Sequence, residues 1–506
     1  MTTSNFDTVA VIGAGTMGAG IVQVAAQAGH RVYLYDARDG AARDARDRLK
    51  ATLEGLVTKG KLDAAAAEAA MARIVPAGAM SELADAGLVV EAIVENLGVK
   101  QGLLRELEAI IAPDAVLASN TSSLSITALA RELKHPGRLV GMHFFNPVPL
   151  MKLVEVVSGL RTDRAVADAI FELAKGWGKT PVHAKSTPGF IVNRIARPYY
   201  AEALALLQEQ AATPAQLDAA LRGAGFRMGP CELMDLIGHD VNFAVTESVY
   251  AANFGDKRYV PSLVQRELVD GGLLGRKSGE GFYRYPAETE RAQGAAIALA
   301  SGAVSVHGNG LLAQRLAQGL QGSGLDVKLV AVSDWIGIET STLQLRLTDG
   351  RAAQQLAAQT RQRDIAVFDW ALSDTPQAAL AFAVAAGASE ASVAQAASLL
   401  AAAGFTPLRI ADAAGLVVAR TVAMLINEAA DAVQQGVCDA NAADTAMKLG
   451  VNYPAGPFEW LARVGVGATV LLLDALFAVY RSERYRVSPW LRQQDWRRQT
   501  SSGSPT

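Results

Sequence analysis

Hydrophobic residues in the first part of the chain form short continuous runs that alternate with segments of helical spacing. Residues 8–12 (TVAVI) form a run typical of a buried strand, and the apolar positions that follow, up to Gly29, recur with helical spacing. Residues 31–35 predict a second strand. Further apolar runs at 87–93 and 115–118 continue the alternation, with helical segments between them. Strands that alternate with helices predict a parallel, doubly wound α/β sheet.

The pattern changes after this sheet. Residues 138–157 contain more strand-like sequence, whereas residues 181–189, with two prolines, predict a linker. From Phe190 onward the spacing becomes helical. Residues 190–210 predict one long amphipathic helix that either tolerates Pro198 or is kinked there. We therefore expect an all-α domain after the sheet.

Part of this helical sequence occurs twice. Residues 178–196 align without a gap on residues 404–422, so that identical residues recur 226 positions later. Upstream of the second copy, residues 306–332 look like a diverged copy of the first strand–turn–helix–strand unit. We predict two related halves, the second degenerate. The open alternative is a pair of unrelated helical domains.

Composition and charge narrow the class of protein. The 506 residues are 50% hydrophobic and 19% charged, which excludes an intrinsically disordered chain. The net charge of -3 gives no strong field toward nucleic acid or an anionic membrane, although it does not address a local basic patch. The longest apolar stretches, such as 468–473, are too short to span a bilayer, and the N-terminus lacks the features of a signal peptide.

The two cysteines, Cys231 and Cys438, are far apart in the sequence. They exclude a disulfide scaffold and give no support for a cysteine zinc site. We therefore expect a cytoplasmic protein without a bound metal, a membrane partner or a nucleic-acid partner.

A glycine-rich turn separates the first strand from the first helix. Residues 13–18 (GAGTMG) fit the pattern G-x-G-x-x-G in the context where it binds dinucleotides. In that role Gly13 permits the tight turn, Gly15 lets the backbone approach a pyrophosphate, and Gly18 lets helix and sheet pack closely. The N–H groups at the helix start then bind the anion. The alternative is a glycine-rich turn in a sheet that binds no nucleotide.

The end of the second strand bears on which dinucleotide would bind. Asp36 is placed to accept hydrogen bonds from ribose hydroxyls, which favours NAD because a carboxylate repels a 2′-phosphate. Arg38 nearby leaves this preference open. In the second copy the third glycine is replaced by Ala313, and the strand ends in residues 330–332 (VAV) rather than in an acid. We expect no dinucleotide there, or very weak binding.

Together these patterns predict an α/β fold, with a Rossmann-type doubly wound sheet followed by an all-α domain and the pair duplicated with a degenerate second half. The expected domains are 1–186, 187–286, 287–410 and 411–498, followed by a disordered tail at 499–506.

Two residues in the strand-like sequence before the helical part are candidates for acid–base chemistry. His143 ends an apolar run and is followed by an Asn-Pro turn, and Glu155 lies within LVEVV. A carboxylate in such a run needs a partner, because burying an unpaired charge is costly. An imidazole is one such partner, and a Glu that accepts its N–H fixes the tautomer. The alternative is a core histidine and a separate edge-strand glutamate.

A third candidate segment follows the strand at 115–118. Residues 119–124 (SNTSSL) come at the carboxyl end of that strand, where open α/β sheets bind ligands. Their hydroxyl groups either bind a substrate oxygen or cap the helix that begins near Ile126.

Six segments, in this order, resemble the L-3-hydroxyacyl-CoA dehydrogenase family: GAGTMG, VVEAIVEN, SNTSSL, MHFFNPVPLMKLVEVV, TPGFIVNR and MGPCELMDLIG. The resemblance covers residues 5–285. The two-half layout is similar to the long bacterial form, a 3-hydroxyadipyl-CoA or 3-hydroxybutyryl-CoA dehydrogenase associated with phenylacetate and aromatic-acid breakdown. The resemblance implies NAD-dependent oxidation of (3S)-3-hydroxyacyl-CoA to 3-oxoacyl-CoA in fatty-acid β-oxidation or phenylacetate catabolism.

The resemblance also implies roles for individual residues. It makes His143 the general base, Glu155 its orienting carboxylate, and Ser122 and Asn193 contacts to the substrate. The cofactor contacts that it implies are Gly13, Gly15, Thr16, Met17, Gly18, Asp36, Glu95, Lys100, Ser122 and Asn146. Contacts to CoA fall more loosely on Thr52 and Lys59, and the lysines at 50, 59 and 61 equally fit a solvated helix face.

The second half departs from the family pattern. Ala419 stands where Asn193 would recur, and residues 308–506 contain no histidine. The resemblance implies that short family members form dimers through their helical domains. We therefore expect the second half to take the place of the second subunit as an internal dimer partner. A homo-oligomer of the whole chain is a further option. Two other readings stay open: a non-catalytic NAD-binding structural protein, and a bifunctional enzyme with another activity in the second half.

Overall fold

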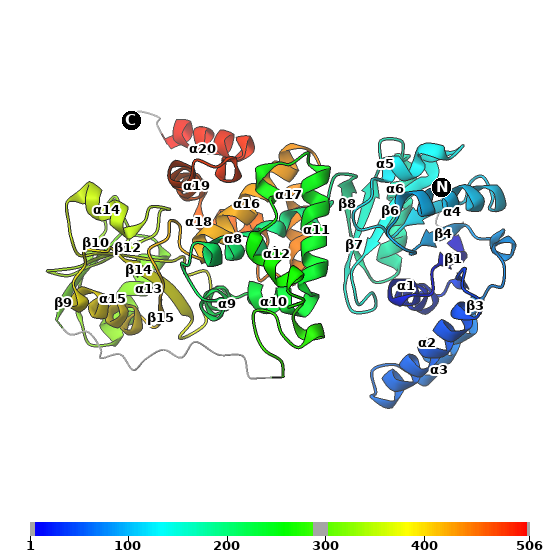
Figure 1. Cartoon of the computed structure of the whole chain (residues 1–506), viewed down its shortest axis with the longest axis horizontal. Coiled ribbons are helices and arrows are strands. Elements are labelled where there is room, and N and C mark those ends of the chain that lie inside the picture. The colour runs from blue at the N-terminus through cyan, green and yellow to red at the C-terminus, as the bar shows by residue number, and fades with distance from the viewer. Residues whose placement is uncertain (1–5, 287–301, 503–506) are drawn as a thin grey trace. The chain divides into compact units, whose positions relative to one another are not determined.

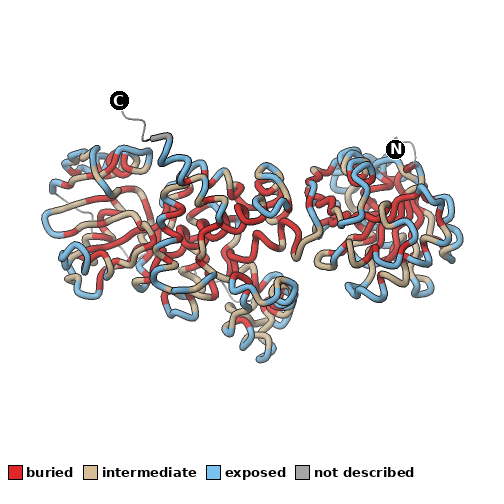
Figure 2. The backbone as a smooth tube through the Cα atoms, turned by 90° about the horizontal axis from the view of Figure 1, so that it is seen from above, coloured by how far each residue is buried: buried red, intermediate tan, exposed pale blue. Residues whose placement is uncertain are grey.

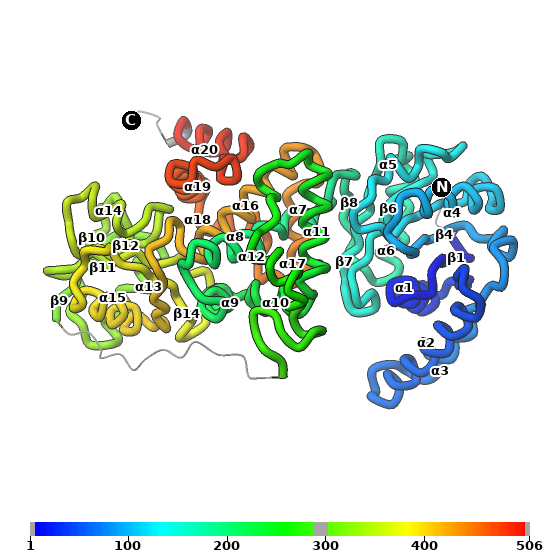
Figure 3. The backbone as a smooth tube through the Cα atoms, viewed as in Figure 1, coloured from blue at the N-terminus to red at the C-terminus, as the bar shows by residue number. Residues whose placement is uncertain are grey.

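The computed structural model describes residues 6–286 and 302–502 (Figure 1). Contacts divide the chain into two compact units. Unit 1 comprises Met1–Arg194 with Gln435–Val451, and unit 2 comprises Ile195–Gln434 with Asn452–Thr506. Each unit has its own buried interior (Figure 2). The chain therefore passes from unit 1 to unit 2, returns once to unit 1 for residues 435–451, and then continues in unit 2, a path that can be followed in Figure 3.

Unit 1 is built on an eight-stranded sheet in the order β3-β2-β1-β4-β5-β6-β7-β8. Neighbouring strands are parallel except β6 and β7, which pair antiparallel. The strands are β1 Thr8–Ile12, β2 Arg31–Tyr35, β3 Ile74–Pro76, β4 Leu88–Glu91, β5 Val116–Ser119, β6 Leu139–Phe144, β7 Leu153–Ser158 and β8 Thr180–Lys185. This is the predicted doubly wound sheet with two reversed strands at one end.

Helices connect and cover these strands. They are α1 Thr16–Gln27, α2 Ala41–Thr58, α3 Ala64–Arg73, α4 Leu97–Ile110, α5 Ile126–Leu129, α6 Arg164–Gly176, the short α7 Val192–Ile195 and, from far along the sequence, α17 Ala440–Gly450. The long α2 and α3 pack on one another and extend away from the sheet (Figure 1). Helix α17 packs on β7 and β8.

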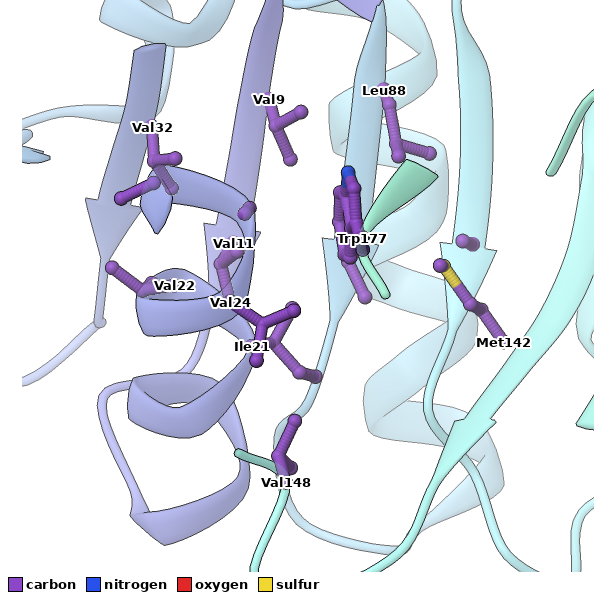
Figure 4. Packing of buried hydrophobic residues seen from close by; sticks show 14 of the residues in the cluster. Val9, Val11, Ile21, Val22, Val24, Val32, Leu88, Met142, Val148 and Trp177 are labelled. Carbon is purple, nitrogen blue, oxygen red and sulfur yellow. The ribbon is translucent and has the colours of Figure 1, made fainter. Parts of the chain in front are cut away.

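The core of unit 1 lies between the sheet and the helices α1 and α6. Val9 and Val11 on β1 point to the same face, as period-two alternation requires, and meet Ile21 of α1 (Figure 4). Trp177, at the end of α6, closes the cluster over Leu88. This packing fixes the glycine turn between β1 and α1, because both of its flanking elements are immobilised.

The predicted linker at 181–189 is wrong in its first part. Residues 180–185 form β8, which pairs in parallel with β7 and places Pro181 opposite Val154. A proline lacks the N–H group needed for a central strand, but β8 is the last strand of the sheet. The proline therefore signalled an edge strand rather than a linker.

Unit 2 contains the helical parts of both halves. Its helices include α8 Arg197–Gln208, α9 Pro214–Gly223, α10 Pro230–Ile237, α11 His239–Ala252, α12 Leu263–Asp270, α16 Val418–Gln434, α18 Pro457–Val464, α19 Val466–Tyr480 and α20 Pro489–Ser502. The predicted long helix at 190–210 is broken at Ala196 into α7 and α8, whereas its repeat α16 is continuous. Pro198 supplies the reason, since its repeat position holds Met424.

A second sheet completes unit 2, in the order β10-β9-β11-β12-β13-β14-β15. Its strands are β9 Ala303–His307, β10 Asp326–Val330, β11 Gly337–Glu339, β12 Gln344–Leu347, β13 Ile365–Phe368, β14 Ala379–Val384 and β15 Thr406–Arg409, and its helices are α13 Leu311–Gly322, α14 Ala353–Thr360 and α15 Glu390–Ala402. The short β11 runs antiparallel to both of its neighbours. The second sheet is the degenerate copy that the sequence predicted. The exact domain boundaries given above remain a prediction.

The C-terminal region differs slightly from expectation. Helix α20 continues through Ser502, past the expected start of a tail at 499, and residues 503–506 lie outside the described residues. Within residues 6–286 and 302–502, no single helix has the length and apolarity to cross a bilayer. The pair α18 and α19 meets the criterion only jointly, with a bend of 99°.

Candidate active site

The glycine turn of unit 1 has the geometry of an anion cradle. Gly13 has φ of 108°, and a Cβ there would lie 2.5 Å from Ala92 O. A Cβ on Gly18 would lie 1.8 Å from Gly13 O, so the turn closes only with glycine. At Gly15 a Cβ would meet nothing within 4 Å, and α1 starts at Thr16 without a side-chain cap. The helix N-terminus therefore faces open space, which suits the pyrophosphate of a dinucleotide.

Asp36 stands beside this turn, one residue after β2. Its carboxylate accepts hydrogen bonds from Ala14 N at 2.8 Å, Arg38 N at 2.9 Å and Arg38 Nε at 3.2 Å. Burial by itself would raise the pKa of Asp36, but these hydrogen bonds and the charge of Arg38 outweigh it and lower the pKa. The carboxylate is therefore ionised near neutral pH, and both of its oxygens are acceptors suited to ribose hydroxyls.

The structure adds a buried charge that the sequence patterns did not single out. Glu91, at the end of β4, accepts a hydrogen bond from Lys100 Nζ at 2.5 Å and from Ser119 Oγ at 2.6 Å. Glu91 and Lys100 are both buried. The available signal was an acid inside the apolar run 87–93 with a lysine nine residues later. Glu91 therefore links β4 to α4 through Lys100 and to β5 through Ser119.

Glu95 organises the SNTSSL segment. Its Oε1 accepts hydrogen bonds from Thr121 Oγ1 at 2.7 Å, Ser122 N at 2.9 Å, Ser122 Oγ at 3.2 Å and Ser123 Oγ at 3.0 Å. Burial would raise the pKa of Glu95, but the Thr121 hydroxyl and the charge of Lys100 outweigh it and lower the pKa. Glu95 is thus an ionised acceptor that fixes the turn carrying Ser122.

The helix that follows this segment has its own cap. Ser125 Oγ accepts a hydrogen bond from Ala128 N, so Ser125 is the N-cap of α5. Ser122 lies three residues earlier and remains half-buried. Capping therefore does not account for Ser122.

His143 and Glu155 meet across the antiparallel strands β6 and β7. They are directly paired in register, and His143 Nδ1 lies 2.6 Å from Glu155 Oε2. Glu155 is fully buried, and its Oε1 accepts hydrogen bonds from Ile191 N and Val192 N, both at 3.0 Å, at the start of α7. A carboxylate accepts a hydrogen bond from Nδ1–H, so the proton stays on Nδ1 and the other imidazole nitrogen, Nε2, is left as the acceptor.

The remaining predicted site residues divide into two groups. Asn193, in α7, donates from Nδ2 to Ser122 O at 3.5 Å, so it lies near both Ser122 and the Glu155-bound helix start. Asn146 is exposed in the turn after β6. Thr52 and Lys59 are exposed on or next to α2, where Thr52 Oγ1 donates to Arg48 O. The structure thus gathers Ser122, His143, Glu155 and Asn193 but shows no contact of Thr52 or Lys59 with them.

The second half has replaced the histidine. At the repeat offset of 226, Asp369 takes the position of His143 and Ala381 that of Glu155. The fully buried Asp369 accepts hydrogen bonds from Val417 N at 2.9 Å and Val418 N at 2.7 Å. A carboxylate therefore still anchors the start of the repeated helix, but no imidazole is paired with it.

Among the described residues there is no cluster of three or more His, Cys, Asp or Glu residues able to hold a metal ion. The residues at the glycine turn, in contrast, fit a dinucleotide in backbone shape and in charge. The arrangement in unit 1 is thus an imidazole–carboxylate pair in the same domain as a nucleotide cradle.

Comparison with known families covers most of the chain. Residues 8–187 match the model of the 3-hydroxyacyl-CoA dehydrogenase NAD-binding domain. Residues 189–285 and 415–499 each match the C-terminal domain of the same family. Residues 345–413 match a 3-hydroxybutyryl-CoA dehydrogenase reduced Rossmann-fold domain. The two helical copies therefore belong to one family, as the sequence repeat predicted.

Individual relatives agree with this assignment. A 3-hydroxyadipyl-CoA dehydrogenase from Escherichia coli is 47% identical over 97% of both chains. A probable 3-hydroxybutyryl-CoA dehydrogenase from Deinococcus radiodurans is 45% identical over 54% of this chain and 99% of its own length. The crystal structure of an E. coli 3-hydroxybutyryl-CoA dehydrogenase superposes with a TM-score of 0.89 at 45% identity, covering 98% of this chain and 99% of that one. The chain therefore belongs to the 3-hydroxyacyl-CoA dehydrogenase family, in its long two-half form, and is an NAD-dependent oxidoreductase.

Proposed function

We propose that the protein oxidises (3S)-3-hydroxyacyl-CoA to 3-oxoacyl-CoA with His143 as general base and Glu155 as its orienting carboxylate. The observation that carries the proposal is the 2.6 Å contact of His143 Nδ1 with Glu155 Oε2. Glu155 cannot swing away, because its second oxygen is held by two N–H groups of a helix start. The imidazole is therefore fixed in both orientation and tautomer.

In this mechanism His143 Nε2 accepts the proton of the C3 hydroxyl. Glu155 stabilises the resulting imidazolium across the Nδ1 hydrogen bond. Ser122 and Asn193 hold the substrate oxygens, and Glu95 fixes the Ser122 turn. NAD, when bound at the Gly13 turn beside Asp36, supplies the hydride acceptor. Loss of the hydroxyl proton and of the C3 hydride converts the alcohol to the ketone.

The acyl group is a separate question. The relatives named above carry the names of adipyl and of butyryl substrates. We infer a short-chain or medium-chain 3-hydroxyacyl-CoA as the substrate class, consumed in the degradation of fatty acids or of aromatic acids such as phenylacetate.

We also propose that the second half is an internal partner for the catalytic unit. Residues 435–451 belong to unit 1, where α17 packs on β7, the strand that carries Glu155. Lys185 N donates to Val437 O at 2.9 Å, and Arg194 Nη1 donates to Gln435 Oε1 at 2.8 Å. The second half thus contributes to the fold around the His143–Glu155 pair without supplying a reacting group.

The variant His143→Gln tests the proposed base. The amide keeps a similar size but cannot take up the hydroxyl proton, so kcat should fall by about 10²–10⁴-fold. NADH affinity, measured by fluorescence titration, should stay unchanged because the Gly13 turn is untouched. NADH formation from a 3-hydroxyacyl-CoA is the assay. Turnover close to that of the wild type would refute the role of His143, and a wild-type protein that forms no NADH would favour a non-catalytic NAD-binding protein.

A further inference from the structure

Unit 2 contains a chain of polar side chains that the proposed mechanism does not use. His307 is the last residue of β9, Glu339 is the last residue of the neighbouring β11, and Ser333 lies between β10 and β11. His307 Nδ1 is 3.1 Å from Ser333 Oγ, and His307 Nε2 is 3.0 Å from Glu339 Oε2. A hydroxyl, an imidazole and a carboxylate are thus linked in series at the carboxyl end of a strand, where open α/β sheets bind ligands.

Neighbouring side chains hold this series in place. Glu339 Oε1 accepts a hydrogen bond from Gln344 Nε2 at 2.8 Å, so each of its oxygens has a partner. The ring of His307 stacks on Trp335 with a distance of 4.1 Å between ring centres, and the guanidinium of Arg346 lies 4.6 Å from the centre of the Trp335 ring. The His307 side chain is only 12% exposed. The imidazole is therefore fixed by stacking and by contacts at both of its nitrogens.

The hydrogen bonds assign the protons of this series. A carboxylate only accepts, so Nε2 of His307 carries the proton that Glu339 binds, and Nδ1 is left as the acceptor. Ser333 Oγ accepts a hydrogen bond from Trp335 N at 3.4 Å, which leaves its own proton for Nδ1. A serine that donates to an imidazole, which is in turn oriented by a third group, is the arrangement that activates a hydroxyl as a nucleophile.

The hydroxyl of this series belongs to the lining of a cavity. The cavity has a volume of about 470 Å³ and is lined by Gly308, Asn309 and residues 331–336, which include Ser333 and are mostly apolar. Pockets for small molecules measure about 300–1,000 Å³. The apolar lining suits a short acyl chain, and the amide of Asn309 supplies a hydrogen-bond donor in the same cavity.

We propose that Ser333, His307 and Glu339 form a second catalytic site that hydrolyses esters or thioesters of small carboxylic acids. Ser333 Oγ attacks the acyl carbon while His307 Nδ1 takes up the hydroxyl proton, and Glu339 stabilises the imidazolium. The bond to the alcohol or thiol then breaks, and His307 returns the proton to that leaving group. Asn309 donates to the oxygen that becomes negatively charged during attack.

Water completes the reaction. It loses a proton to His307 Nδ1 and attacks the acyl-Ser333, which releases the carboxylic acid and returns the proton to Ser333 Oγ. All residues of this site lie in unit 2, and none of them has a role in the oxidation proposed for unit 1. The second half would thus carry an activity of its own, independent of the proposed dehydrogenase function.

The test uses the full-length protein and two probes, p-nitrophenyl butyrate for esters and butyryl-CoA for thioesters. Release of nitrophenol or of thiol measures turnover. Ser333→Ala and His307→Gln should each lower kcat by at least about 100-fold, because each removes the nucleophile or its base. NADH formation from a 3-hydroxyacyl-CoA should stay unchanged in both variants. Ser323→Ala is the matched control, since the Ser323 hydroxyl lies in the same sheet domain but donates to Ala402 O at 2.8 Å.

Labelling with a fluorophosphonate provides a second readout that does not depend on the Ser333→Ala variant being folded. In the wild type, mass spectrometry should find the label on Ser333, and His307→Gln should label at least about 100-fold more slowly. Turnover of only one of the two probes assigns the site to esters or to thioesters. A wild type that turns over neither probe, a label that does not reach Ser333, or a folded Ser333→Ala variant as active as the wild type would overturn the proposal.

Discussion

Glu155 connects the chemistry of the site to its folding, because its two oxygens bind different partners. One faces the imidazole of His143, and the other accepts the N–H groups of Ile191 and Val192. The fully buried carboxylate is satisfied only when strand β6, which carries His143, and the start of α7 are both in place beside β7. Buried charges persist under such conditions, when hydrogen bonds compensate their desolvation.

The variant Glu155→Gln should expose this dual role. Its amide oxygen can still accept the two helix N–H groups, which leaves the NH₂ group facing His143 Nδ1. Nδ1 then becomes an acceptor, the proton moves to Nε2, and the base is lost. We expect kcat to fall by about 10²–10⁴-fold while NADH affinity is retained. Glu172→Gln, on the exposed side of α6, serves as the control, and wild-type turnover in Glu155→Gln would contradict the assignment.

The repeated helices show how single residues shape an element. Pro198 interrupts the first copy at Ala196, whereas α16 runs unbroken. Helices α8 and α16 pack on one another, and the fully buried Arg420 of α16 pairs with Glu202 of α8 at 2.8 Å. Arg484 joins the same carboxylate. Ion pairs as well as apolar packing therefore hold the two helical copies together.

This ion cluster predicts a pH dependence of stability. Burial would raise the pKa of Glu202, but the charges of Arg484 and Arg420 outweigh it and lower the pKa. A lowered folded-state pKa adds stability above the unfolded value, near 4.5, and that stability is lost as the pH falls through the folded-state pKa. At pH 7, Glu202→Gln should destabilise the protein by about 3–5 kcal/mol, because it leaves buried arginine charges uncompensated.

The difference in free energy of unfolding between the wild type and Glu202→Gln should decrease below pH 4.5, where Glu202 becomes protonated. Denaturant unfolding followed by circular dichroism at several pH values measures it. Asp270→Asn, which removes the exposed Arg266–Asp270 pair of α12, should leave the unfolding midpoint unchanged. An equal loss of unfolding free energy in both variants would show that the buried Glu202 ion pairs stabilise the protein no more than an exposed pair does.

At the scale of the whole molecule, two features define the architecture: the duplication of the two halves, and the return of residues 435–451 from unit 2 to unit 1. Unit 1, which contains the proposed site, includes residues 435–451, although these follow the degenerate second sheet in the sequence. Gly450 lies so close to β7 and α7 that a Cβ there would be 2.7 Å from a Leu153 methyl group and 3.0 Å from one of Val192. The second half has Asp369 at the position that repeats His143, but its helix α17 packs closely against β7, the strand that carries Glu155.

A chain that ends at Pro286 tests this interdependence. It keeps every proposed site residue but lacks α17, so the surface of β7 and β8 that α17 covers is exposed. We expect the fragment to aggregate, or to dimerise through its helical domain, and to lose at least about 10-fold in kcat/KM. Size-exclusion chromatography and NADH formation measure both effects. A soluble, monomeric and fully active fragment would show that the second half is not an internal partner.

Much of the fold of unit 1 and the internal duplication can be predicted from local sequence patterns. The β1–α1–β2 unit, the Gly13 turn, Asp36 and the duplicated helical module all follow from short-range patterns, because hydrophobic period and glycine spacing are local properties. The pairing of His143 with Glu155 was expected only as one of two alternatives, since sequence spacing does not fix strand register.

Features that depend on contacts between residues far apart in the sequence became visible only in the folded chain. Residues 180–185 became an edge strand because β7 was available to pair with them. Glu91 and Lys100 became a buried pair because α4 folds back over β4. The return of residues 435–451 to unit 1 left no signal in their composition, since packing partners hundreds of residues away act through space and not through local pattern.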